Sequence, residues 1–150
     1  MAAPIVRAIT VQQPYASAFF LPESPKNIEN RTFSIEHPTI LAIVAGKLTA
    51  PAAPAHAQPA AGVELPHGLI LGVVWLTEIH EQFDANCRCV PENVGGWALS
   101  NPLSAPRPMK HWCVGRPRPV PAGLRFPYTG FQGVRTLGAP VTEALLRAVS

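Results

Sequence analysis

Three ionisable side chains, Lys26, Glu29 and Arg31, lie within one short stretch of the sequence. A guanidinium can fork onto a phosphate or stack on a base, and a lysine ammonium can neutralise a phosphate. A carboxylate between them can accept a hydrogen bond from a base amino group or hold the two cations in place. The same residue types also form exposed ion-pair clusters that do no chemistry, so spacing alone leaves both interpretations open.

The segment that carries these residues is predicted to be extended. Ile28 to Ile35 alternates in part between apolar and polar residues. Alternation in an extended segment places Glu29, Arg31 and Phe33 on one face. Lys26 lies in the preceding turn, which can bring its amine back toward Glu29. We therefore expect the three charged groups to share one polar cleft.

Four further residues are candidates for lining that cleft: Gln13, Tyr15, Lys47 and Trp97. Tyr15 and Trp97 offer aromatic surfaces on which an unpaired base can stack. Lys47 follows a predicted strand end, from which a loop can present it to the cleft. Each has a structural alternative, because Gln13 and Tyr15 can cap and pack the first helix and Lys47 can be a solvated surface lysine.

Short strands separated by turns rich in proline and glycine dominate the remaining pattern. A helix is predicted over Tyr15 to Leu21, behind Pro14, and a terminal helix over Val141 to Val149 with Thr142 as its N-cap. Trp75 lies in the most apolar strand and is predicted to be core. The predicted strands are Arg7 to Val11, Thr39 to Ala45, Gly68 to Glu78, and shorter ones around Trp97 to Leu99, Trp112 to Val114 and Gly130 to Leu137. This pattern predicts an α+β, mainly β fold: a small barrel with a few peripheral helices.

The composition favours one compact domain over residues 1–150. Hydrophobic residues make up 47% of the chain and charged residues 14%, which is the reverse of the balance typical of disorder. No apolar run approaches the ~20 residues of a membrane-spanning helix, and no signal peptide precedes the first strand. The three cysteines then have no secretory context, so we expect a cytoplasmic protein with reduced thiols. The net charge of +3 is compatible with a phosphate-bearing partner.

Five stretches, in this order, resemble the ASCH domain family. They are Gln13 to Ala16, Lys26 to Arg31, Leu41 to Lys47, Pro66 to Val74 and Trp97 to Pro102. The second is similar to the family's G-x-K-x-x-E-x-R signature, with Lys26, Glu29 and Arg31 in register. The fourth resembles its P-x-G-x-I-x-G strand, and the fifth its W-x-L-x-N-P step.

The resemblance implies a PUA-like pseudo-β-barrel, from a superfamily tied mostly to RNA. It implies that the cleft binds RNA or a nucleotide, with no membrane partner. Some similar members are ribonucleases, or amidohydrolases acting on acylated pyrimidine nucleosides, so a hydrolase with Lys26 and Glu29 as catalytic residues is the alternative. The sequence departs from the pattern where Ser24-Pro25 replaces a glycine, where Val44 replaces a frequent histidine, and where Glu29 replaces the amidohydrolase threonine.

A second constellation consists of Cys87, Cys89, His111 and Cys113, with His80 upstream. Cysteine and histidine at i and i+2 on strands would point the same way, and four such ligands suit tetrahedral zinc. Reduced, partly buried thiols are the interpretation that we favour. We therefore predict no metal and no cofactor.

Two proline-rich stretches complete the pattern. The proline-alanine tract at residues 50–62 is predicted to be a surface loop, because closely spaced prolines interrupt any helix. The stretch from Arg107 to Arg125 is basic and can form a positive rim along a phosphate backbone or a solvated loop. A protein-interaction adaptor that uses these stretches is the second functional alternative.

Overall fold

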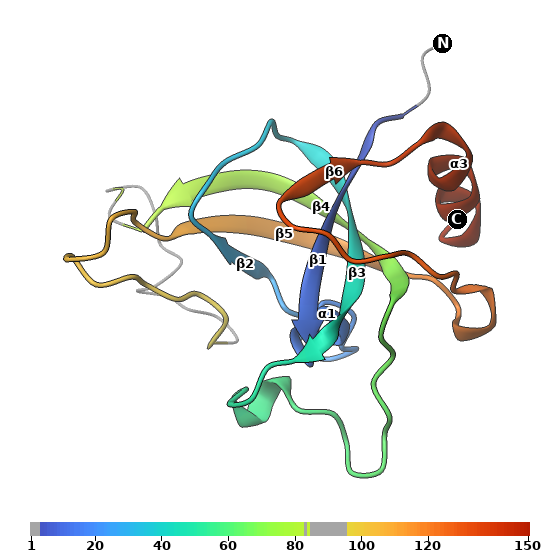
Figure 1. Ribbon diagram of the computed structural model, residues 1–150, viewed down its shortest axis with the longest axis horizontal. Helices are drawn as coiled ribbons and strands as arrows, with labels where there is room; N and C mark the ends of the chain where they lie inside the picture. The colour runs from blue at the N-terminus through green and yellow to red at the C-terminus, as the bar shows by residue number, and fades with distance from the viewer. Residues whose placement is uncertain (1–3, 83, 85–95) are drawn as a thin grey trace.

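A six-stranded sheet in the order β2-β5-β4-β3-β1-β6 forms the body of the protein (Figure 1). The computed structural model describes residues 4–82, 84 and 96–150. β1 and β3 pair in parallel, and the other neighbouring strands pair antiparallel. The strands are β1 (Val6–Gln13), β2 (Ile28–Arg31), β3 (Thr39–Thr49), β4 (Leu69–Glu81), β5 (Lys110–Pro119) and β6 (Val134–Thr136).

In the part of the chain that the structure describes, two short α-helices and two 3₁₀ turns accompany the curled sheet: α1 (Tyr15–Ala18), η1 (Ala55–Ala57), η3 (Ala122–Leu124) and α3 (Ala139–Ala148). The prediction of a mainly β, PUA-like α+β fold is confirmed. Within the described residues, no helix is both long enough and apolar enough to cross a membrane.

Both faces of the sheet are buried around the middle of β3, which explains the continuous apolar run in that strand. Leu41 and Ile43 belong to a core on one face, together with Phe19 and Trp112. Ala42 and Val44 belong to a second core on the opposite face, which α3 covers through Leu145. A strand packed on both sides has no solvent-facing positions, so its sequence loses the polar alternation of a half-buried strand.

The sheet curls where β4 carries irregularities in its pairing. The register of β4 shifts once against β3 and twice against β5. Gly72 lies in this region, and a Cβ there would come within 2.4 Å of the Arg118 carbonyl oxygen and 2.7 Å of the Phe20 ring. Glycine at position 72 therefore allows a close approach of the β5 backbone and the Phe20 ring that a larger side chain would prevent.

Three local predictions are wrong. Residues 97–99 form no strand, because the Trp97 carbonyl and the Leu99 amide form hydrogen bonds with the Asn30 side chain instead. Thr142 does not cap α3. The helix starts at Ala139 behind Gly138, and the Thr142 amide already donates to the Gly138 carbonyl.

Trp75 is the third of these errors, because its side chain is not in the core. It is 36% exposed, although its strand is the most apolar in the chain. Its cross-strand neighbour on β5 is Gly115, which has no side chain to cover the indole. The pattern of a single strand does not reveal which residues lie across the sheet from it, so it does not predict this exposure.

Candidate functional site

A cavity of about 640 Å³ opens beside β2, with Lys26, Glu29 and Arg31 on its wall. The end of β1 supplies Thr10, Val11 and Gln12, and two irregular segments complete the enclosure. These segments contribute Ala52, Pro54 and His56 from the proline-alanine tract, and Gly96, Trp97 and Leu99 from the chain before β5. The cavity thus combines residues from the whole first two thirds of the sequence.

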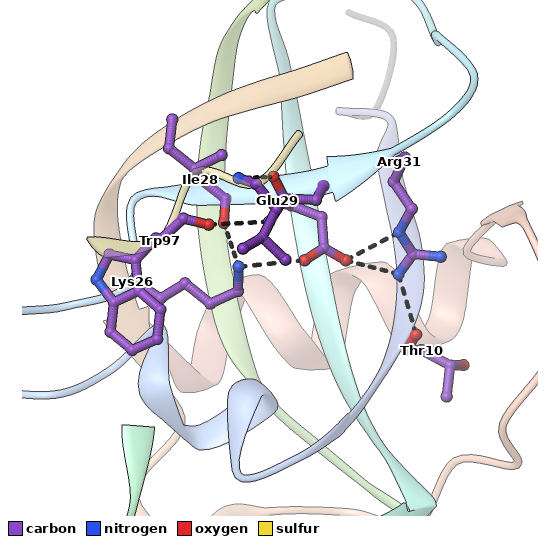
Figure 2. Close-up of polar contacts among 8 residues, drawn as sticks. Thr10, Lys26, Ile28, Glu29, Arg31 and Trp97 are labelled. Carbon is purple, nitrogen blue, oxygen red and sulfur yellow. Dashed lines mark hydrogen bonds and ion pairs between the residues drawn. The ribbon is translucent and has the colours of Figure 1, made fainter. Parts of the chain in front are cut away.

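Glu29 is the centre of a nearly buried ion-pair network. Lys26 and Arg31 approach its carboxylate from opposite sides (Figure 2). The Lys26 Nζ lies 3.4 Å from Oε1, and the Arg31 Nε and Nη2 lie 2.8 and 2.7 Å from Oε2. The alternation predicted for this segment is therefore realised in β2, where Glu29 and Arg31 share a face.

The Lys26 ammonium sits among aromatic rings. Its Nζ lies 5.9, 5.1 and 5.6 Å from the ring centroids of Tyr15, Phe19 and Trp97, and it donates to the Ile28 carbonyl. Burial lowers the pKa of Lys26 from its ordinary value of 10.5, and the nearby Glu29 carboxylate partly offsets that effect. A buried lysine of this kind can exchange its proton at a lower pH than a surface lysine.

Arg31 retains an unused donor beside the cavity. Its Nη2 donates to the Thr10 carbonyl at 3.1 Å as well as to Glu29. Its Nη1 bonds to none of the residues that the structure describes, and the side chain is 20% exposed. By contrast, both carboxylate oxygens of Glu29 already contact cations. Arg31 can therefore meet an anionic ligand, whereas Glu29 orients the cations.

Asn30 fixes the far wall of the cavity to β2. Its Nδ2 donates to the Trp97 carbonyl at 2.9 Å, and its Oδ1 accepts from the Leu99 amide at 2.9 Å. Trp97 is consequently held against Lys26 with only 4% of its surface exposed. The side chain that points to the opposite face from Glu29 thus positions a segment 67 residues away.

No protein-family model and no curated protein matches the sequence. Solved structures match along its length. ASCH from Zymomonas mobilis is 14% identical and superposes with a TM-score of 0.58, covering 97% of this chain and 96% of that chain. A serine-to-alanine mutant of that protein is 16% identical with a TM-score of 0.59, again covering 97% and 96%.

A tyrosine-to-phenylalanine mutant of the same protein is 15% identical, with a TM-score of 0.58, and covers 97% of this chain and 99% of that chain. The chain has the fold of an ASCH domain. At this level of identity the match concerns the fold alone. The function must therefore be argued from the residues that the ASCH fold places at the cavity.

Of the other residues singled out in the sequence, Tyr15 and Trp97 line the cavity, and Gln13 and Lys47 do not. Gln13 is fully buried, and its amide bonds to Ser17 and to the Pro66 carbonyl. Lys47 is exposed at the end of β3. In this ASCH fold Gln13 joins α1 to the chain before β4, which is the packing role that its position also suggested.

The cysteine and histidine constellation is only partly within the described residues, because Cys87 and Cys89 lie outside them. The Cys113 Sγ lies 3.8 Å from the His80 Nδ1, and the His111 Nε2 lies 2.6 Å from the Leu99 carbonyl. The described part of the chain contains no group of three or more residues able to hold a metal ion.

The arginines near the end of β5 in the basic stretch lie apart from the cavity. Arg116 and Arg118 are exposed and line a separate hollow of about 390 Å³ with Val149. In the ASCH fold they belong to the end of β5 that lies near α3, whereas Lys110, at the other end, pairs with Arg31 of β2 (Figure 1).

Among the cavity residues that sequence reasoning missed, His56 and Asn30 matter most for the site. His56 is the only aromatic side chain in the proline-alanine tract, which was the available signal. Asn30 stands between Glu29 and Arg31, where alternation assigns it to the other face. Its role depends on a distant segment, so no local pattern identifies it.

Proposed function

We propose that the cavity binds one unpaired nucleotide, either free or as part of a single-stranded RNA. The observation that carries this proposal is a cavity that combines an available guanidinium with aromatic rings around a buried Lys26–Glu29–Arg31 network. Phosphate, ribose and base each require a different kind of partner. A cavity that offers a cation and a ring side by side supplies a partner for the phosphate and a partner for the base, which are the two partners that discriminate best.

The size of the cavity supports a single small ligand. Its volume of about 640 Å³ lies within the range of about 300–1,000 Å³ that is usual for small-molecule sites. Its wall comes from separate segments that enclose it, so a base pair within a helix would remain out of reach. Single-stranded RNA can turn one base out of its stack and into such a site.

The electrostatics support an anionic group at Arg31. The network contains two cations and one carboxylate, so it carries one net positive charge while Lys26 is protonated. The Arg31 guanidinium has Nη1 available for a phosphate oxygen. The carboxylate of Glu29 repels anions, but its Oε2 is covered by the guanidinium.

The direct test is fluorescence anisotropy of a labelled short single-stranded RNA with the wild type and with Arg31→Ala. We expect measurable binding that weakens about 5-fold to 100-fold in the variant, as for the loss of one charged contact. Arg118→Ala removes an exposed arginine outside the cavity and is the matched control. Equal loss in both variants would locate binding elsewhere, and no binding by the wild type to RNA or free nucleotides would refute the proposal.

A second candidate function is hydrolysis of a modified nucleoside or of RNA. The observation that favours it is the lowered pKa of Lys26, whose neutral amine can act as a general base next to Glu29. In this hydrolysis water is the nucleophile, and the Lys26 amine accepts its proton. Turnover of acylated cytidine or RNA by the wild type, abolished in Lys26→Met, would establish this function.

The proline-alanine tract supports ligand binding rather than an adaptor role. Three of its residues, Ala52, Pro54 and His56, line the cavity, and Ala57 is buried beside Trp97. A segment used in this way is not free to extend toward a partner protein.

A further inference from the structure

Two aromatic rings, those of His56 and Trp97, meet at an angle and form a corner on the wall of the cavity. The centroids of His56 and Trp97 lie 4.4 Å apart, and their planes make an angle of 71°. His56 is exposed, whereas Trp97 is 4% exposed. The two rings therefore differ in accessibility: a ligand in the cavity can reach the exposed imidazole, but little of the indole.

The position of His56 is fixed by the turn that contains it. Ala57, the next residue, is 3% exposed and packs in a small core with Trp97 and Ile28. The proline-alanine tract also contains an internal hydrogen bond, in which the Gln58 Nε2 donates to the Ala53 carbonyl at 2.9 Å. A surface loop rich in proline and alanine is thus anchored at the residue beside His56.

The opposite segment leaves space for the imidazole. Gly96 has a φ of +75°, and a Cβ there would lie 3.2 Å from the His56 Cε1. Glycine is the residue that adopts this backbone conformation without strain, and its missing side chain admits the ring. Both walls of the cavity therefore accommodate His56 at the corner.

Trp97 supports this corner from behind. Its indole contacts His56 at an edge, and the Lys26 Nζ lies 5.6 Å from its centroid. Edge-to-face contact between aromatic rings is a favourable arrangement that restrains both rings. The ring nitrogens of His56 form no hydrogen bond with the residues that the structure describes, so packing against Trp97 and Gly96 holds the imidazole.

We propose that His56 is the surface on which the base of the ligand stacks, with Trp97 as its support. This inference rests on the proposed function and specifies the ligand class: a planar heteroaromatic base joined to an anionic group that reaches Arg31. Stacking tolerates different bases, because every base has a π face. The site therefore distinguishes nucleotides from sugar phosphates more strongly than one base from another.

The test compares AMP, CMP and ribose 5-phosphate by isothermal titration calorimetry with the wild type, His56→Ala, His56→Phe and His56→Gln. We expect His56→Ala and His56→Gln to weaken AMP and CMP binding about 10-fold. His56→Phe should retain it, because phenylalanine keeps a ring of similar size. Binding of ribose 5-phosphate should be the same in all four proteins. His37→Ala, which changes an exposed histidine outside the cavity, should bind as the wild type.

The alternative outcomes separate this inference from the proposed function. Nucleotide binding by the wild type that His56→Ala leaves unchanged would overturn stacking on His56 and leave the cavity site standing. A loss in His56→Phe equal to that in His56→Ala, or an equal loss of ribose 5-phosphate, would also overturn stacking. Failure of the wild type to bind AMP, CMP or RNA would overturn both. Circular dichroism of each variant verifies that it is folded.

Discussion

Arg31 contacts Glu29 through a single carboxylate oxygen: its Nε lies 2.8 Å and its Nη2 lies 2.7 Å from Oε2. This arrangement leaves Oε1 for the Lys26 ammonium and leaves the Arg31 Nη1 beside the cavity. One nearly buried carboxylate thereby positions two cations of different kinds. Its removal should affect stability and ligand binding together.

Glu29→Gln should destabilise the protein by about 2–4 kcal/mol, because it leaves the buried Lys26 and partly buried Arg31 without a counter-charge. Urea unfolding followed by tryptophan fluorescence measures this change. Glu143→Gln is the matched control, because Glu143 pairs with Arg147 across side chains that are each 74% exposed. That exposed pair should contribute less than about 0.5 kcal/mol. Similar losses in the two variants would show that the Glu29 network adds no special stability.

The lowered pKa of Lys26 predicts a pH dependence of stability. Since the folded pKa lies below the ordinary value of 10.5, the unfolded chain binds more protons between these two values. Stability contributed by this group therefore rises with pH in that window and is lowest below the folded pKa. The free energy of unfolding of the wild type minus that of Lys26→Met should increase from pH 7 to about pH 10. A flat or falling difference would mean that burial does not lower the pKa of Lys26.

Local sequence patterns predicted the polar part of the site. Alternation in a short strand brought Glu29 and Arg31 to one face, and the preceding turn returned Lys26 to them. These relationships span only a few residues, so strand geometry decides them. The same holds for β3, whose apolar run from Thr39 to Ala45 marked a strand buried on both faces.

The aromatic wall of the cavity, which consists of His56 and Trp97, could not be predicted in the same way. His56 and Trp97 meet because two irregular segments converge, and the bonds that hold Trp97 come from Asn30 in β2. No periodicity records such a contact. Trp75 illustrates the same limit, since the apolar pattern of its own strand does not record its exposure.

Gly72→Ala should be destabilising by about 1–3 kcal/mol or more, because its Cβ would overlap the Arg118 carbonyl oxygen and the Phe20 ring. The backbone of β5 cannot move away without disturbing its pairing with β4. Gly115→Ala is the matched control, because a Cβ there meets nothing within 4 Å. Thermal unfolding of both variants gives the comparison. Equal melting temperatures for the two would contradict close packing at Gly72.

The salt dependence of RNA binding should be shallow. A cavity that contacts one or two phosphates through Arg31 and Lys26 predicts a slope of log K against log salt of about −0.7 to −1.4. Anisotropy titrations at several salt concentrations measure it. A much steeper slope that Arg116→Ala and Arg118→Ala both reduce would instead place the phosphate backbone on the far end of β5.

Asn30 should control both the stability of the aromatic wall and ligand affinity. Asn30→Ala removes two side-chain hydrogen bonds, to the Trp97 carbonyl and from the Leu99 amide. We expect a loss of about 1–3 kcal/mol in unfolding free energy and weaker nucleotide binding, because Trp97 no longer supports His56.

Asn30→Asp distinguishes the contributions of these two hydrogen bonds. It keeps an acceptor for the Leu99 amide but sets a carboxylate oxygen against the Trp97 carbonyl in place of the donor. Repulsion between the two oxygens should make Asn30→Asp at least as destabilising as Asn30→Ala, and protonation of the new carboxyl at low pH should restore part of the loss. Urea unfolding of both variants at pH 7 and pH 4 tests this. If Asn30→Asp matches the wild type at pH 7, the bond to Trp97 does not hold the wall, and the support of His56 must come from the proline-alanine tract alone.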